Sequence, residues 1–161
     1  MRWPILSRTT AATTATAVAG ALLTDPGSRW YRRLDLPRWQ PAPSTFPLVW
    51  LPLYVDIAVC SAIALDRLSA DPARRGERRQ YRGVLGTNLA LNACWTLLFF
   101  RARRPWLAAA ECAVLTVSSA DLTFRTAHAD RRAGLALAPY PLWCAFATVL
   151  TAAIARRNRG A

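Results

Sequence analysis

The chain has 161 residues, 21 of them basic and nine acidic, which gives a formal charge of +12. Hydrophobic residues make up 53% and seven residues are Trp, a composition that excludes intrinsic disorder. All the basic residues are Arg, and they stand between apolar runs rather than along one face, so we expect no nucleic acid as a partner.

Five runs with few or no charges follow one another along the chain. A bilayer core needs roughly 20 helical residues, with about 17 to 25 as the working range. The runs are apolar nearly all round, whereas a helix on the surface of a soluble protein is apolar on one face only. The sequence therefore predicts an all-α, five-helix, multi-pass membrane bundle in a single domain, 1–161. The expected spans are 5–24, 46–65, 84–100, 105–124 and 133–155.

The first run also offers small residues at 17–21 after two basic residues, as a cleavable secretory signal does. Its Thr-rich middle is a poor apolar segment for such a signal. We therefore expect a retained helix.

The segment after the first run, 25–45, concentrates Pro and Trp. Aromatic rings of this kind settle at the membrane interface, so the segment is predicted to be an ordered lid or interfacial loop. The other expected connectors are 66–83, 101–104 and 125–132. Eleven Arg fall on the N-terminal side of the five spans and ten on the other, which leaves the orientation open. We expect these Arg to contact anionic lipid headgroups.

Few side chains suit conventional catalysis or metal binding. His128 is the only His and lies in a polar connector, so we expect neither a His-based metal centre nor a haem held by two imidazoles. Cys60, Cys94, Cys112 and Cys144 have no metal-ligand spacing and are interpreted as small buried residues. We therefore predict no metal, no obligatory cofactor and no conventional catalytic residue.

Three carboxylates fall inside expected spans. Asp121 lies four residues before Arg125, and an ion pair within the helix explains it. Asp56 and Glu111 have no such neighbour. They indicate either a polar cavity or protonated, hydrogen-bonded contacts between helices.

Aromatic and amide side chains share faces on three of the predicted helices. One explanation is ordinary packing between helices, and the other is a pocket for a flat, apolar ligand. The three faces are Phe46, Trp50, Tyr54; then Asn88, Asn92, Trp95, Phe99; and Tyr140, Trp143, Ala147, Thr151.

Small residues occupy the opposite side of the third predicted helix, at Gly86, Ala90 and Ala93. Small residues let helices approach closely in lipid. The pattern predicts a homodimer contact there, although packing within one chain would use the same residues.

Several motifs resemble the TspO/MBR family of tryptophan-rich membrane proteins. The resemblance runs from about residue 20 to 158, in order and with the family's spacing. It is carried by Trp30-Tyr31 with Pro37, Trp39 and Pro41; Phe46-Pro47-Leu48 with Trp50 and Leu53-Tyr54; Leu89-Ala90-Leu91-Asn92 with Trp95 and Phe99-Phe100; and Pro139-Tyr140, Leu142-Trp143 and Phe146-Ala147-Thr148 with Asn158.

This resemblance implies a five-helix protein of the bacterial cell membrane, often dimeric, that acts as a receptor or sensor for porphyrins, haem and related flat ligands. Two alternatives remain open: an enzyme of light- and oxygen-dependent porphyrin breakdown, in which Trp50 and Trp143 are redox-active, and a transporter of tetrapyrroles or lipids. The implied ligand-binding residues are Trp30, Tyr31, Phe46, Trp50, Tyr54, Asn92, Trp95, Trp143 and Ala147.

The sequence departs from the family pattern at three places. No Tyr lies between Leu150 and Arg156, so the weak cholesterol-binding pattern is absent. Arg38 stands where many members have a second Trp. After Tyr54 the family has a small Met-Gly-type stretch, whereas this chain has Val55-Asp56-Ile57. We expect Asp56 to make the pocket or its rim more acidic.

Overall fold

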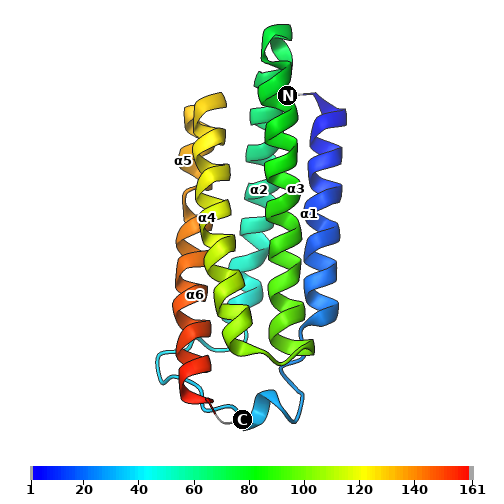
Figure 1. Ribbon diagram of the computed structural model, residues 1–161. Coiled ribbons are helices and arrows are strands. Elements are labelled where there is room, and N and C mark those ends of the chain that lie inside the picture. Colours follow the sequence, from blue (N-terminus) through cyan, green and yellow to red (C-terminus); the bar gives the residue numbers. More distant parts are fainter. Residues whose placement is uncertain (1, 160–161) are drawn as a thin grey trace.

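A computed structural model describes residues 2–159 as an all-helical bundle without strands in that range. Five long helical segments run side by side along it (Figure 1), and two short 3₁₀ turns, η1 (Tyr31–Arg33) and η2 (Pro72–Arg74), interrupt the connections. The segments are α1 (Trp3–Leu23); α2 (Thr45–Ala70); α3 (Arg75–Thr96) with the π-helical turn η3 (Leu97–Arg101); α4 (Pro105–Ala129); and α5 (Arg131–Leu137) followed by α6 (Pro139–Arg157).

Within the described part of the chain, four segments are long and apolar enough to cross a membrane. They are Thr45–Ala70, Pro72–Arg101, Pro105–Ala129 and Arg131–Arg157. The all-α membrane bundle predicted from the sequence is therefore confirmed.

The remaining long helix, α1, has 21 residues but a Thr-rich sequence. Its buried side chains are Thr9, Thr13 and Thr16. Each of these hydroxyls donates to a carbonyl oxygen one turn back in the same helix, at 3.0 to 3.3 Å. The buried hydroxyls of α1 are thus satisfied without water, as a membrane requires.

Two helices extend well beyond the predicted spans. α2 and α3 together occupy most of 66–83, which had been expected to be a connector, and only the short turn at 71–74 separates them. Arg is a good helix former, and the Arg74–Glu77 ion pair, with atoms 2.8 Å apart, supports the first turn of α3. The apolar run shows the part of a helix that lies in lipid, not where the helix ends.

The fifth predicted span, 133–155, is broken by a short interruption at Ala138. Pro139 and Pro141 have no backbone N–H, so neither can continue the hydrogen-bond ladder of α5. α5 itself begins one residue after Asp130, whose carboxylate accepts hydrogen bonds from the N–H groups of Arg132 and Ala133 at 3.1 Å. The expected connector at 125–132 is consequently helical on both sides of Asp130.

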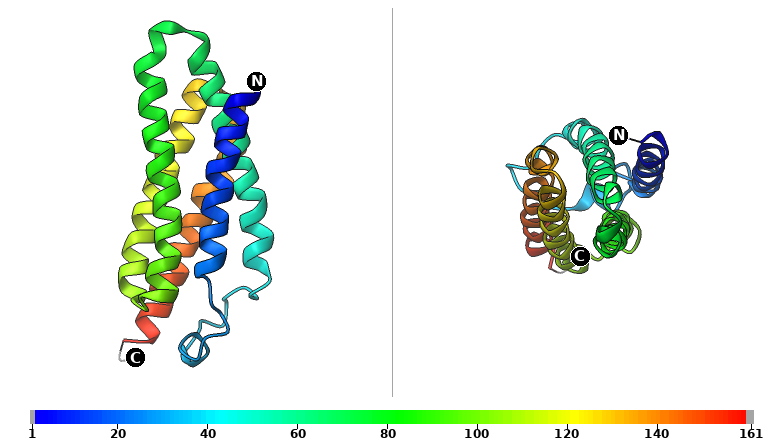
Figure 2. Two further views of the ribbon diagram at one scale, coloured as in Figure 1. Left: turned by 90° about the vertical axis from the view of Figure 1, so that its right-hand side faces the viewer. Right: turned by 90° about the horizontal axis from the view of Figure 1, so that it is seen from above.

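The two ends of the bundle differ in construction (Figures 1 and 2). At one end, here called the connection end, lie residues 24–44, the turn at 101–104 and the end of α6. At the other, the hairpin end, lie the start of α1 and the turns at 71–74 and 130. α4 packs along α6 and α3, while α1 packs on α2 and α3.

Candidate functional site: an aromatic cavity

A cavity of about 440 Å³ lies in the half of the bundle nearest the connection end. α1, α2, α3 with η3, α4 and α6 all supply wall residues, and the 24–44 connection covers the cavity with Pro26, Tyr31, Gln40 and Pro43. The volume falls within the roughly 300–1,000 Å³ typical of small-molecule sites.

The exposed wall residues show where the cavity opens. They lie at the end of α1, in the connection and at the start of α2, and they are Ala21, Thr24, Pro26, Pro43, Pro47 and Leu51. The mouth of the cavity is therefore between the end of α1 and the start of α2, beside the connection.

Stacked aromatic rings form much of the wall. Trp50 stacks on Tyr54 along α2, with ring centroids 5.4 Å apart and planes 29° apart. Trp95 stacks on Phe99, at 5.6 Å and 13°. Trp143 of α6 meets Phe46 edge-on at 6.1 Å. Helical spacing of i, i+3 or i+4 places each stacked pair on one face, so rings from three segments converge on one space.

Eight of the nine residues implied as ligand-binding lie on this wall: Tyr31, Phe46, Trp50, Tyr54, Asn92, Trp95, Trp143 and Ala147. Trp30 does not. Its ring packs edge-on against Phe99 with centroids 5.6 Å apart. Trp30 directly precedes the η1 turn that Tyr31 begins, and the two neighbouring side chains point in different directions. Tyr31 therefore reaches the cavity, while Trp30 packs against the wall residue Phe99 from outside.

Other wall residues carried no signal in the sequence. α1 contributes Ala17, Gly20 and Ala21, and α4 contributes Cys112 and Leu115. Small and aliphatic side chains look the same whether they face a cavity, a helix or lipid, so their place on the wall follows only from the packing of the bundle.

A hydrogen-bond network stands behind the polar part of the wall. The Tyr54 hydroxyl donates to Asn92 Oδ1 at 2.6 Å, and Asn92 Nδ2 donates to the Tyr140 hydroxyl at 3.4 Å. Three helices, α2, α3 and α6, are joined in this way. The network fixes the orientation of the Asn92 amide at the wall.

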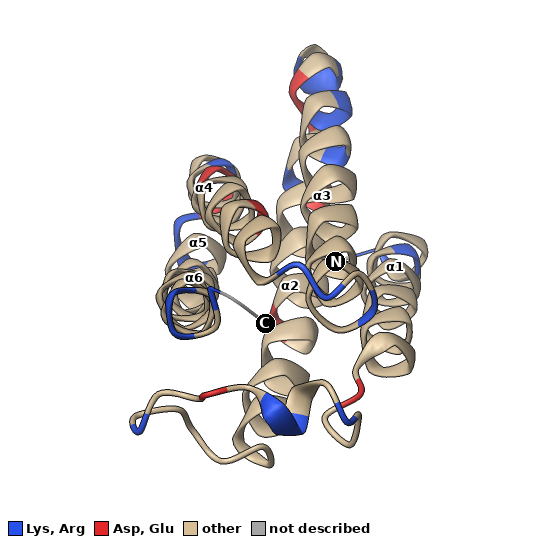
Figure 3. Cartoon of the chain, turned by 60° about the horizontal axis from the view of Figure 1, so that its bottom comes forward, with Lys and Arg blue, Asp and Glu red and all other residues tan. Residues whose placement is uncertain are grey.

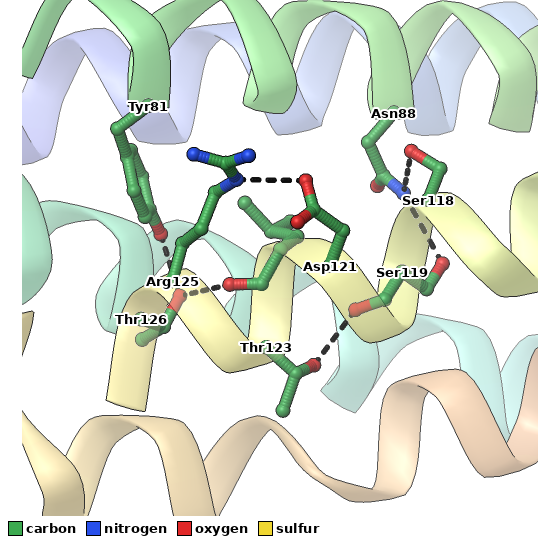
Figure 4. Close-up of polar contacts among 9 residues, drawn as sticks. Tyr81, Asn88, Ser118, Ser119, Asp121, Thr123, Arg125 and Thr126 are labelled. Carbon is green, nitrogen blue, oxygen red and sulfur yellow. Dashed lines mark hydrogen bonds and ion pairs between the residues drawn. The ribbon is translucent and has the colours of Figure 1, made fainter. Parts of the chain in front are cut away.

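The same network continues away from the cavity into α4, where Asn88 meets Ser118 and Ser119 (Figure 4). The Tyr140 hydroxyl donates to Asn88 Oδ1 at 2.8 Å, and Asn88 Nδ2 donates to the hydroxyls of Ser118 and Ser119, both at 3.1 Å. Asn88, Ser119 and Tyr140 are fully buried. Asn88, which was predicted to share a face with Asn92, thus joins helices to one another and does not line the cavity. The serines of α4 that complete the network carried no signal in the sequence.

The geometry of the cavity agrees with a sequence comparison. A family model described as the TspO/MBR family matches residues 9–157. The chain belongs to the TspO/MBR family. The motif residues of this sequence that resemble the family include Phe46, Trp50, Asn92, Trp95 and Trp143, all of which lie on the cavity wall.

Individual TspO/MBR relatives match over most of their lengths. The chain is 30% identical over 158 residues to the tryptophan-rich sensory protein of Cereibacter sphaeroides, covering 98% of this chain and 94% of that protein. It is 27% identical over 157 residues to the human translocator protein, covering 98% and 91%. The tryptophan-rich protein TspO of Bacillus cereus is 26% identical over 122 residues, 76% of each chain.

Three buried polar atoms of wall residues have no hydrogen-bond partner within residues 2–159 of this TspO/MBR protein. They are the indole Nε1 atoms of Trp95 and Trp143 and the Oε1 atom of Gln40. Buried donors normally find an acceptor. A ligand that carries acceptor groups would therefore gain hydrogen bonds from the two indoles on entering the cavity, and a ligand donor could bond to Gln40 Oε1.

The three carboxylates within the spans lie away from the cavity wall. Asp56 is about 200° around α2 from Tyr54 and accepts a hydrogen bond from Cys60 Sγ at 3.0 Å, so the expected acidic pocket or rim is wrong. Asp121 pairs with Arg125 at 2.7 Å, as predicted (Figure 4). Both carboxylate oxygens of Glu111 are buried, and no residue of the described range hydrogen-bonds to them.

No wall residue is charged, and the part of the chain described contains no group of three His, Cys, Asp or Glu that could hold a metal ion. The cavity is therefore suited to stacking and hydrogen bonding. It offers an apolar, ring-lined space with a few fixed polar groups.

Proposed function

We propose that the protein is a membrane receptor or sensor that binds porphyrins and related flat, hydrophobic ligands in this cavity. The observation that carries the proposal is the convergence of stacked rings on one uncharged space. Flat ligands gain most from such walls, because offset stacking adds to the burial of apolar area.

Five wall residues have a specific role in this proposal. Trp50, Trp95 and Trp143 stack on the macrocycle, while Tyr54 and Asn92, held by their 2.6 Å hydrogen bond, orient it. No iron ligand is needed when stacking supplies the affinity. Metal-free protoporphyrin and haem are then expected to bind within about tenfold of each other.

We further propose that two copies associate through the outer face of α3. Gly86 and Ala90 are exposed there, and nothing within 4 Å would meet a Cβ added at Gly86. A surface of small residues lets a second helix approach closely in lipid. Ala93, the third residue of the predicted face, is only half-exposed and would lie at its edge.

The test of ligand binding is an absorbance titration of the purified protein in uncharged detergent with protoporphyrin and with haem. Trp50→Ala removes a wall ring and should weaken protoporphyrin binding roughly tenfold. Trp106→Ala is the matched control, because Trp106 is 49% exposed and lies off the wall. Absence of saturable binding, or equal losses in both variants, would rule out the proposal.

A further inference from the structure

The Arg residues at the two ends of the bundle are neutralised to different extents. Only one of the five ion pairs within residues 2–159 lies at the connection end, where it joins Arg157 and Asp35 at 3.2 Å. The other four, at the hairpin end, are Arg2–Asp66, Arg67–Asp130, Arg74–Glu77 and Arg125–Asp121. Ten Arg and two Asp belong to the connection end, which is therefore strongly positive (Figure 3).

One of these Arg contacts the end of α1, which borders the mouth of the cavity. Arg101 ends η3, directly after the wall residue Phe100, and its Nη2 atom donates to the carbonyl oxygen of Leu22 at 3.2 Å. Leu22 stands between Ala21 and Thr24, two exposed residues of the mouth. Arg101 is itself exposed, and no other hydrogen bond of its guanidinium occurs within the described range.

The wall and the mouth thus differ in what they can stabilise. An anionic group buried against the uncharged wall would lose its hydration without gaining a counter-ion, which is costly. At the mouth the same group would remain partly hydrated and would meet the planar guanidinium, whose paired N–H groups match a carboxylate.

From this contrast we propose an anion subsite at the mouth of the cavity, centred on Arg101. The subsite selects flat apolar ligands that carry a carboxylate or similar anionic group at one edge. Such a ligand inserts its apolar body between the stacked rings and keeps the charged edge at the mouth. This inference rests on the proposed binding of flat ligands and adds the charge and the direction of the ligand.

Asp25 acts in the opposite sense. It is exposed and lies between Thr24 and Pro26, both of which are at the mouth. Because its charge would repel the anionic edge, removing that charge should strengthen binding, whereas removing the charge of Arg101 should weaken it. The two substitutions should therefore change the ligand affinity in opposite directions, although both lie beside the mouth.

The experiment compares protoporphyrin, which has two carboxylates, with its dimethyl ester, which has none. Both are titrated in uncharged detergent at low and high salt. Arg101→Gln should weaken protoporphyrin binding about three- to fivefold at low salt, as for an exposed ion pair, and leave ester binding unchanged. Asp25→Asn should strengthen protoporphyrin binding only, and Arg79→Gln, at the hairpin end, should change neither.

The outcomes separate the subsite from the proposed function. Equal binding of the acid and the ester by the wild-type protein, or an equal loss of both in Arg101→Gln, would overturn the anion subsite while the cavity remained a site for flat ligands. If neither compound binds, the proposed function fails and the subsite fails with it.

Discussion

Tyr140 links the cavity to the interior of the bundle through a single hydroxyl. That hydroxyl accepts from Asn92 and donates to Asn88, and the side chain is fully buried. Tyr140→Phe would leave both amides without this partner. We expect a loss of about 1–3 kcal/mol in the free energy of unfolding, measured by thermal or denaturant unfolding in detergent.

The same substitution should also weaken ligand binding, because Asn92 loses one of the two bonds that orient it. Tyr81→Phe is the matched control. Tyr81 is equally buried and bonds to Ser61 and Thr126 at 3.2 and 2.7 Å, but it lies off the cavity wall. It should reduce stability and leave the dissociation constant unchanged. Weaker binding in both variants would mean that the loss reflects stability alone.

Trp143→Phe distinguishes a receptor from an enzyme that oxidises porphyrin through an indole. Phe keeps a flat ring on the wall, so the affinity for protoporphyrin should fall only a few-fold. In a receptor, the rate of porphyrin photobleaching should then depend only on the fraction of protein that has porphyrin bound. A variant that binds normally but no longer forms a product made by the wild type would show that the Trp143 indole takes part in chemistry.

Side-chain patterns identify rings that lie on the cavity wall wherever large rings repeat at helical spacing. Phe46, Trp50 and Tyr54 share one face of α2 because residues four apart always do. Trp30 could not be placed in this way, since it lies in a short turn with no period. Asp56 was misjudged for a related reason: closeness to Tyr54 in the chain does not mean the same side of the helix.

A close approach between α4 and α5 depends on a glycine, which has no side chain. A Cβ added at Gly134 would overlap the backbone and the Cβ of Ala127. Gly134→Ala should therefore force the helices apart and cost about 1–3 kcal/mol of unfolding free energy. Gly83→Ala is the control in an open position, where nothing lies within 4 Å, and it should be neutral or stabilise α3 by about 0.5–1 kcal/mol.

The cap of α5 predicts a pH dependence. Hydrogen bonds from the backbone N–H of Ala133, with further help from the Arg67 guanidinium, lower the pKa of the Asp130 carboxyl. The stabilisation is therefore complete above the ordinary carboxyl pKa near 4 and is lost as the pH falls through the lowered value. Asp130→Ala should cost about 0.5–2 kcal/mol at neutral pH.

Unfolding measured against pH checks this expectation. The difference in stability between wild type and Asp130→Ala should shrink as the pH falls below about 4. Asp130→Asn keeps an oxygen for the cap but has no titrating carboxyl, so its stability should lack this contribution to the pH dependence. A stability difference between wild type and Asp130→Ala that stays the same at every pH would contradict the role of Asp130 as the cap of α5.

Helix boundaries were the least predictable elements. Apolar runs locate the part of a helix that lies in lipid. The ends of the helix depend instead on capping residues and on charged helical turns, which are stable in water and which hydropathy does not reveal. The first turns of α3 contain four Arg, at positions 75, 78, 79 and 82, and still form regular helix. The interruption at Ala138 was foreseeable in principle from Pro139 and Pro141, but uniform hydropathy across 133–155 concealed it.

The exposed small residues on the outer face of α3 predict how two copies of the protein associate. Gly86→Leu places a bulky side chain on the proposed contact and should convert a dimer to a monomer in detergent, as measured by light scattering on a sizing column. Gly76→Leu is the control, because Gly76 is equally open but lies near the hairpin end of α3. An unchanged dimer in the Gly86 variant would place the interface elsewhere.

The Thr-rich face of α1 has a consequence for synthesis. Its hydroxyls are satisfied by the carbonyls of their own helix, so the helix tolerates hydrocarbon, yet it gains little by entering it. α2 is more apolar and packs along α1. Insertion of α1 by the translocon is therefore expected to wait for α2, and the two helices would leave the channel together as a pair.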